Sequence, residues 1–181
     1  TAYAPGMRVT GLIYRGFAEL AWADQRWVTP IPDNLAYAEA LGEPLGCVLS
    51  GARRTRVELG DTVAIVGLGF MGLLTLQALR LRGPAHLIAI DPREDARRLA
   101  LALGADEALT PEEVPDRRKL TQWAQLGHGF GIDIAVEASG TQAGLTLAGQ
   151  MAREHGVLSI VGYHQGGLRA VDLELWNWKA L

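Results

Sequence analysis

Short apolar runs alternate with longer amphipathic segments along most of this chain, a pattern typical of strands followed by helices. The runs suited to buried parallel strands cover residues 63–66, 86–90, 107–109, 132–136 and 156–161. Segments with helical character follow the first four of these runs, at 73–81, 93–103, 116–126 and 141–153. Strands and helices that alternate at this spacing predict a doubly wound α/β fold, in which helices cover both faces of one parallel sheet.

The beginning of the chain has a different pattern, in which glycine and proline interrupt short extended pieces. We expect strands at 7–13 and 17–23, and a short extended piece at 28–32. This β region is too short to bury a face of its own. It must therefore pack on the remainder of the chain or on residues outside it.

Two helices are expected between this region and the first buried strand. Asn34 is a candidate cap for one that reaches Leu41, and a second covers residues 43–54. We therefore divide the chain into a partial β region with its junction, residues 1–42, and an α/β domain, residues 43–181.

The composition is that of a globular protein without a signal for nucleic acid or membrane. Hydrophobic residues make up 49% of the 181 positions, and the net charge of −3 gives no basic footprint for nucleic acid. No segment approaches the ~20 uninterrupted apolar residues of a membrane span, and the N-terminus lacks the pattern of a signal peptide. The single cysteine, Cys47, excludes an internal disulfide and fits a reducing compartment, so we expect a cytoplasmic protein.

The most informative motif is a glycine-rich turn after the strand at 63–66. It fits G-x-G-x-x-G: the first glycine permits a tight turn, the second lets backbone approach a pyrophosphate, and the third lets the next helix pack on the strand. The start of that helix offers free N–H groups and a positive dipole end to phosphates. The alternative is a turn that needs glycine for packing only. The predicted dinucleotide-binding residues here are Gly67, Leu68, Gly69, Phe70, Met71 and Gly72.

A carboxylate is expected to hold the adenosine ribose of this ligand. Asp91 ends the strand at 86–90, about twenty residues beyond the turn, where an acid accepts hydrogen bonds from the ribose hydroxyls and repels a 2′-phosphate. It therefore favours NAD over NADP. Arg93 is close enough to stack on adenine or to contact a 2′-phosphate, which leaves the choice of cofactor open. Asp91 is also a candidate cap for the helix that follows.

The ends of the fourth and fifth strands complete the predicted site, since the carboxyl ends of parallel strands meet at one edge of the sheet. Glu137 is expected to hydrogen-bond neighbouring backbone N–H groups, while Gly140 and Gly162 permit close approach of the backbone. His164 is a candidate acid–base group, a candidate contact to the nicotinamide ribose, or a histidine of a surface loop. The residues expected along the cofactor are Ala138, Ser139, Val161, Gly162 and Tyr163.

Two further groups of residues invite an interpretation. Glu43 and Cys47 share one helix face, but a catalytic zinc usually takes about three protein ligands and a water, and we expect Cys47 to be a buried structural cysteine. Trp176 and Trp178 alternate with other residues and indicate an edge strand or a packing surface.

Taken together, the motifs resemble the medium-chain dehydrogenase/reductase superfamily, in its zinc-containing alcohol and polyol dehydrogenase form. The resemblance implies a Rossmann domain preceded by a short β remnant of the GroES-like catalytic domain. The segments that carry it occur in the family's order at 5–9, 16–19, 43–45, 67–72, 91, 103–106 and 137–140.

The resemblance also implies a chemistry and an assembly. A hydride moves between a small alcohol or carbonyl substrate and nicotinamide, while a zinc ion polarises the oxygen. Glu43 is implied as a zinc ligand or near-ligand, as in some sugar and polyol members. The segments that carry the family's other zinc ligands and its proton relay have no counterpart here, so the chain resembles a middle fragment and no catalytic residue is assigned. Cofactor domains of this family often pair edge to edge, which makes residues 171–178 a candidate edge for a homodimer.

The motifs therefore predict the NAD-binding part of an alcohol or polyol dehydrogenase. Two alternatives stay open: a zinc-free NAD(P)H-dependent quinone or enoyl reductase of the same superfamily, and a non-catalytic dinucleotide-binding module. Asp91 and the Glu-Pro-Leu at 43–45 argue against the first, because those relatives more often use NADPH.

Overall fold

The computed structural model describes residues 3–181, which form two compact units that meet in sequence between Cys47 and Val48. This point lies within helix α1 (Gly42–Thr55), which matches the helix expected at 43–54. The division into domains at residues 42 and 43 stays a prediction.

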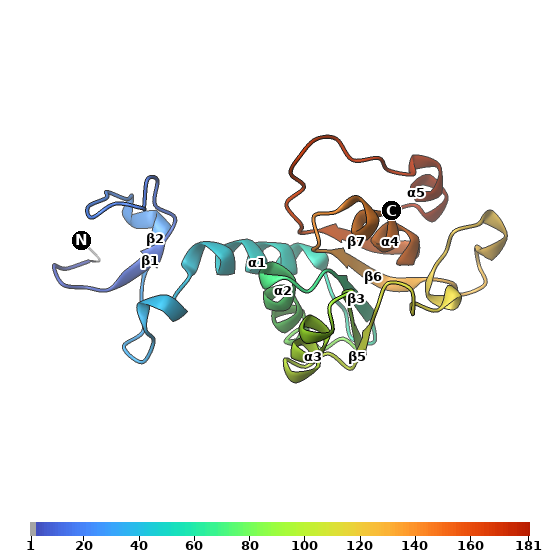
Figure 1. Cartoon of the computed structure of the whole chain (residues 1–181), viewed down its shortest axis with the longest axis horizontal. Helices are drawn as coiled ribbons and strands as arrows, with labels where there is room; N and C mark the ends of the chain where they lie inside the picture. Colours follow the sequence, from blue (N-terminus) through green and yellow to red (C-terminus); the bar gives the residue numbers. More distant parts are fainter. Residues whose placement is uncertain (1–2) are drawn as a thin grey trace. The chain divides into compact units, whose positions relative to one another are not determined.

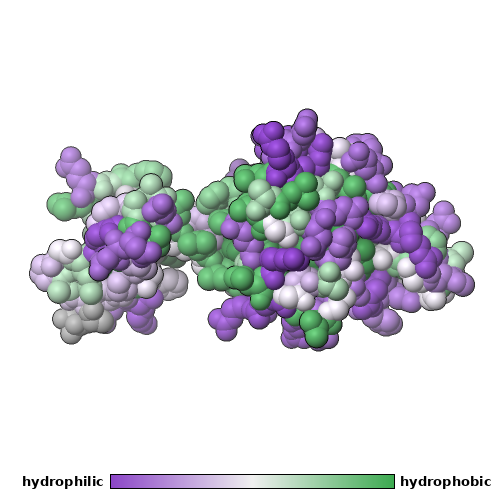
Figure 2. All heavy atoms as spheres, turned by 90° about the horizontal axis from the view of Figure 1, so that it is seen from below, coloured by the Kyte–Doolittle hydropathy of each residue, from purple (hydrophilic) through white to green (hydrophobic). Residues whose placement is uncertain are grey.

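The N-terminal unit contains one small antiparallel sheet (Figure 1). Strand β1 (Val9–Gly11) pairs with strand β2 (Val28–Pro30), and the 3₁₀ turns η1 (Gln25–Trp27) and η2 (Tyr37–Glu39) complete its regular structure. A sheet of two short strands cannot bury a face of its own. Hydrophobic residues accordingly lie on the surface of this unit (Figure 2). Phe17 and Leu20 are exposed, and so are the large aromatic side chains of Tyr14 and Trp22.

Two expectations for this unit are wrong. Residues 17–20 form bends and residues 21–23 are irregular, so the strand expected at 17–23 is absent. An extended segment needs a partner for its N–H and C=O groups, and β1 and β2 pair with each other. Residues 34–41 form only the turn η2 instead of a helix. Tyr37 and Leu41 are exposed, so this segment lacks the packed apolar face that stabilises a short helix.

The second unit is built on five parallel strands in the order β5-β4-β3-β6-β7, which confirms the doubly wound fold. Val66 pairs with Ile90 on one side and with Glu137 on the other, so the three central strands end level with one another. The strands are β3 (Thr62–Val66), β4 (His86–Ile90), β5 (Glu107–Leu109), β6 (Ile132–Glu137) and β7 (Ala152–Ile160).

Helices cover both faces of this sheet, and each face has its own apolar core. Leu76 of α2 packs with Ile65 in one core, and Met151 of α4 packs with Val66 in the other. Successive residues of β3 thus point to different cores, which explains why that strand is apolar throughout. Among residues 3–181, none of the helices has the length and apolar composition that a bilayer crossing requires. The helices of this unit beyond α1 are α2 (Phe70–Arg80), α3 (Glu94–Ala102), α4 (Gln142–Met151) and α5 (Leu173–Lys179).

The helix expected at 116–126 is absent, and two 3₁₀ turns, η3 (Asp116–Arg118) and η4 (Trp123–Gln125), replace it. Leu120 is buried, and its N–H donates to the carbonyl of Gln150 at 2.8 Å. The side chain of Gln125 accepts from the backbone N–H groups of residues 121 and 122. These bonds satisfy the backbone without a helix.

Helix α5 replaces the strand expected at 171–178, so the edge-strand interpretation is wrong and the packing interpretation is confirmed. Asp172 caps the helix by accepting from Leu175 N at 2.9 Å. Trp178 packs edge-on against Trp123, with 5.5 Å between ring centroids. The outer strand on this side of the sheet is β7, so residues 171–178 cannot supply the sheet edge of a homodimer.

One lysine is fully buried at the end of α5. Lys179 Nζ donates to the carbonyls of Gly149 at 2.7 Å and Gln150 at 2.9 Å, in the last turn of α4. Carbonyls at the end of a helix have no partner within the helix and attract a cation. Burial nevertheless lowers the pKa of Lys179 to about 8, and Asp172 opposes this shift only in part.

This pKa predicts a pH-dependent stability. Between pH 8 and pH 10.5 the unfolded chain binds a proton at Lys179 that the folded chain does not bind. The free energy of unfolding, measured relative to that of Lys179→Met, should therefore rise with pH across this window, by on the order of 3 kcal/mol. Urea titrations of both proteins at several pH values measure this difference. A difference that stays constant with pH would contradict the expectation.

Candidate functional site

The turn after β3 needs two of its three glycines for its own packing. Gly67 has a φ of +100°, and a Cβ on it would lie 2.5 Å from Ser139 N. A Cβ on Gly72 would overlap the carbonyl oxygen of Gly67. Gly69 is different: its φ is −72°, and a Cβ there would meet nothing within 4 Å. The protein itself therefore does not require glycine at position 69 for packing, whereas the motif predicts glycine there for the approach of a ligand.

The start of α2 presents free donors beside Gly69. Gly69 is the N-cap and supplies no side-chain cap. The backbone N–H groups of Gly69, Phe70 and Met71 find no acceptor among residues 3–181. Free N–H groups at the positive end of a helix dipole form a site for an anion such as phosphate.

A cleft of about 430 Å³ opens next to this helix start, at the carboxyl ends of β3, β4 and β6. Of the predicted cofactor residues, it is lined by Gly67, Gly69, Asp91, Arg93, Ala138 and Ser139. The cleft also contains residues that the motifs did not indicate. Thr141 is one of them; it is the N-cap of α4, and its side chain accepts a hydrogen bond from Gly144 N at 3.0 Å. For the others the only signal was their position at or just after the ends of β3 and β4, after β5, or in α4: they are Val66, Ile90, Pro92, Pro111, Ala143, Gly144 and Leu147.

The remaining predicted residues lie outside this cleft. Leu68 is buried in the core beneath α2, and Phe70 and Tyr163 are exposed. Their roles, with those of Met71, Gly72, Val161 and Gly162, stay predictions.

Asp91 is buried at the end of β4 and accepts four hydrogen bonds. Oδ2 accepts from Leu68 N at 2.8 Å and from Arg93 Nη2 at 3.0 Å. Oδ1 accepts from Arg93 N at 2.9 Å and from Arg93 Nε at 3.0 Å. Burial by itself would raise the pKa of Asp91, but the hydrogen bonds from Arg93 and Leu68 outweigh it and hold the pKa below its ordinary value. The carboxylate is thus ionised at the point where a ribose is expected.

A second buried carboxylate joins the ends of β6 and β7. Glu137 Oε1 accepts from Ser139 N at 2.8 Å and from Gly140 N at 2.9 Å, which confirms the expected backbone bonds, and also from Ser139 Oγ at 2.5 Å. A Cβ on Gly162 would overlap Glu137 Oε2. The close approach expected of Gly162 is thus an approach to Glu137.

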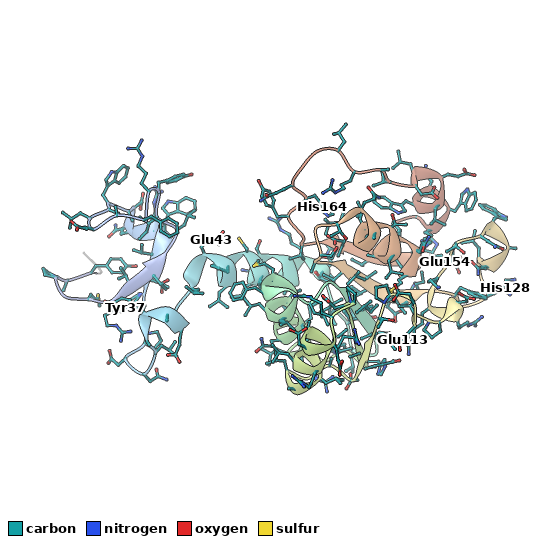
Figure 3. All side chains as sticks on the ribbon, in the orientation of Figure 1. Tyr37, Glu43, Glu113, His128, Glu154 and His164 are labelled. Carbon is teal, nitrogen blue, oxygen red and sulfur yellow. The ribbon has the colours of Figure 1, made fainter. Side chains whose placement is uncertain are left out.

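His164, labelled in Figure 3, lies in the loop after β7 and contacts this carboxylate. Its Nε2 lies 2.8 Å from Glu137 Oε2, and its Nδ1 accepts from Arg169 Nε at 3.3 Å. Because Nδ1 is the acceptor, this hydrogen-bond network assigns the proton to Nε2. The side chain is only 16% exposed. His164 therefore holds the two loops together, and Arg169, which no motif indicated, fixes its tautomer.

The candidate metal residues lie on α1, where Figure 3 labels Glu43. Cys47 Sγ donates to Glu43 Oε1 at 3.2 Å, and this hydrogen bond is the main reason why the pKa of the thiol is raised. The expectation of a buried Cys47 is wrong, because its position in α1 leaves it exposed. In residues 3–181 no three His, Cys, Asp or Glu side chains gather as a metal site would require.

Replacement of Glu137 tests the network. Both carboxylate oxygens of Glu137 accept hydrogen bonds, but the amide of Glu137→Gln has only one acceptor oxygen. Its NH₂ group must face either His164 Nε2–H or the backbone N–H groups of residues 139 and 140, so two hydrogen-bond donors then face each other. We expect a loss of about 2 kcal/mol in the free energy of unfolding. Urea denaturation measures it, with Glu112→Gln, an exposed glutamate, as the matched control. Equal unfolding midpoints for the two variants would show that the network does not stabilise the fold.

Comparisons with known proteins show what the whole chain is similar to. In solved structures, the chain is similar to a protein of Sinorhizobium meliloti described as a zinc-binding dehydrogenase and bound to NADP, with a TM-score of 0.72, 28% identity, and coverage of 86% of this chain and 46% of the other. It is also similar to 2R,3R-butanediol dehydrogenase from Bacillus subtilis, with a TM-score of 0.69, 26% identity, and coverage of 87% and 44%.

Curated relatives give the same picture. The chain is 33% identical to an alcohol dehydrogenase of Cupriavidus necator over 78% of its own length, and 32% identical to sorbitol dehydrogenase of Bacillus subtilis over 76%. It spans only 38% of the length of each. The family model for zinc-binding dehydrogenases matches residues 71–177. The chain therefore belongs to the zinc-binding dehydrogenase family, as the resemblance to the zinc-type medium-chain dehydrogenases implied.

Proposed function

We propose that this chain supplies the nicotinamide-dinucleotide site of an alcohol or polyol dehydrogenase, with NAD as the preferred cofactor. The observation that carries the proposal is the start of α2. Three free backbone N–H groups and a glycine that the protein does not need for packing adjoin a cleft large enough for part of a dinucleotide.

The residues of the cleft fit the parts of such a ligand. The N–H groups of Gly69, Phe70 and Met71 would hold the pyrophosphate, and Asp91 would hold the adenosine ribose. Ala138 and Ser139, at the end of β6, would lie farther along the cofactor. Glu137 does not face the ligand in this scheme, since its bonds keep the neighbouring loops in place.

The chemistry of the whole enzyme follows from the cofactor and the relatives. A bound nicotinamide accepts a hydride from an alcohol carbon or donates one to a carbonyl. Relatives named for alcohol, sorbitol and butanediol support a small alcohol or polyol as the substrate. The described residues do not by themselves form a zinc site, so Glu43 is proposed only as one ligand among others outside this chain. A cytoplasmic location and a homodimer through the sheet edge, which β7 would supply in place of residues 171–178, are part of the same proposal.

Gly69→Ala tests the phosphate site. The new methyl group meets no protein atom within 4 Å, so the fold should keep its stability. It would, however, stand where the pyrophosphate approaches the backbone. We expect NAD affinity to fall at least about tenfold, or about 1.4 kcal/mol. Isothermal titration calorimetry measures the NAD affinity. The control is Gly46→Ala in α1, where the new methyl group also meets no protein atom within 4 Å. Equal NAD affinity in both variants would place the dinucleotide elsewhere.

Asp91→Ala tests the ribose contact. The variant loses an acceptor for ribose hydroxyls and a negative charge that repels a 2′-phosphate. NAD should bind at least about tenfold more weakly, while NADP changes less, so the preference for NAD narrows. Calorimetric titration with both dinucleotides measures the change, and Asp95→Ala on α3 controls for the loss of charge. Unchanged affinity for both dinucleotides would remove Asp91 from the site.

A further inference from the structure

The Asp91 carboxylate has no acceptor position left for a ribose. A carboxylate accepts at about four lone-pair positions, two on each oxygen. In this structure Oδ1 accepts from Arg93 N and Nε, and Oδ2 accepts from Leu68 N and Arg93 Nη2. A ribose hydroxyl that donates to Asp91 must therefore displace one of these donors.

Only one of the donor groups is free to leave. Two of the four bonds come from backbone N–H groups, at Leu68 and Arg93, whose positions follow from the turn after β3 and the start of α3. The other two come from the guanidinium of Arg93, whose side chain is 56% exposed. Release of this side chain opens one position on each carboxylate oxygen. That is the arrangement that the two adjacent hydroxyls of a ribose require.

The paired state suits a different ligand. A guanidinium has five N–H donors, and Asp91 takes two of them, so three remain for an anion. With Arg93 in place, the Asp91 charge is neutralised and a guanidinium stands beside the ribose position. A 2′-phosphate would meet donors there instead of a bare carboxylate.

We propose that Arg93 is a specificity-determining residue that competes with the ribose hydroxyls for Asp91 and serves as the ligand of a 2′-phosphate. NAD binds after the guanidinium has left the carboxylate, and NADP binds while the pair is intact. Arg93 thereby weakens the preference for NAD that Asp91 alone would produce. This inference rests on the proposed dinucleotide site and names the residue that sets its cofactor preference.

Removal of the side chain separates the two roles. In Arg93→Ala the carboxylate is open to the ribose, so NAD should bind about three- to tenfold more tightly, whereas NADP should bind at least about tenfold more weakly. Arg93→Lys keeps a positive charge without the fork, so it should keep more of the NADP affinity than Arg93→Ala does. Arg98→Ala removes the same charge from an exposed position of α3 and should change neither affinity by more than about twofold.

Calorimetry with NAD and NADP on the full chain measures these affinities, and thermal denaturation verifies that each variant is folded. NAD affinity that is unchanged or lower in Arg93→Ala overturns the inference and leaves the proposed function in place. An equal loss of NADP affinity in Arg93→Ala and Arg98→Ala also overturns it, because the effect would then be one of net charge. No binding of either dinucleotide to the unaltered chain overturns the proposed function, and the inference with it.

Discussion

The candidate site depends on one close contact between two pieces of backbone, the carbonyl of Gly67 at the end of β3 and Gly72 in the first turn of α2. No Cβ fits between them, so the helix starts directly against the strand. Gly67 N donates to Ile90 O, and Ala138 N donates to Val66 O, which ties the turn to the strands on both sides. The free N–H groups of α2 therefore lie where three strand ends are level. Moving the helix outward to admit a side chain at Gly72 would separate those donors from the cleft.

The α/β unit was predictable because its local and tertiary preferences agree. A strand buried on both faces has no polar alternation, and the run at 63–66 has none, since its residues serve two cores. Thr141 has the side chain of an N-cap and acts as one. Glu137 is the last residue of β6, and its side chain accepts from two backbone N–H groups of the loop that follows. In each case the residue type alone points to the contact that it makes.

The errors occur where contacts with distant residues decide the structure. Leu120 leaves the helical pattern of 116–126 because its N–H bonds to the end of α4, thirty residues away in the chain. The alternating tryptophans at 176 and 178 have the period of a strand, but Asp172 caps a helix there and Trp178 packs on Trp123. A pattern within ten residues contains no information about partners of this kind. The strand predicted at 17–23 in the N-terminal unit is absent for a related reason. This unit has too little apolar core of its own to hold that segment in a regular structure.

Asp91 shows a second reason why a sequence motif is not enough. The motif identifies the carboxylate, but it does not tell whether the acceptor positions of that carboxylate are already occupied. An acid at the end of β4 is a ribose acceptor only to the extent that its lone pairs are free, and here hydrogen bonds from Leu68 and Arg93 fill all of them. The pair is nearly neutral, whereas the opened carboxylate carries a full negative charge. Rotation of a single exposed side chain thus changes both the hydrogen-bonding capacity and the charge of the ribose position, and no movement of the sheet or helices is needed. Under the proposed function, cofactor preference would therefore be a property of the Asp91–Arg93 pair after β4, which neither residue would determine alone.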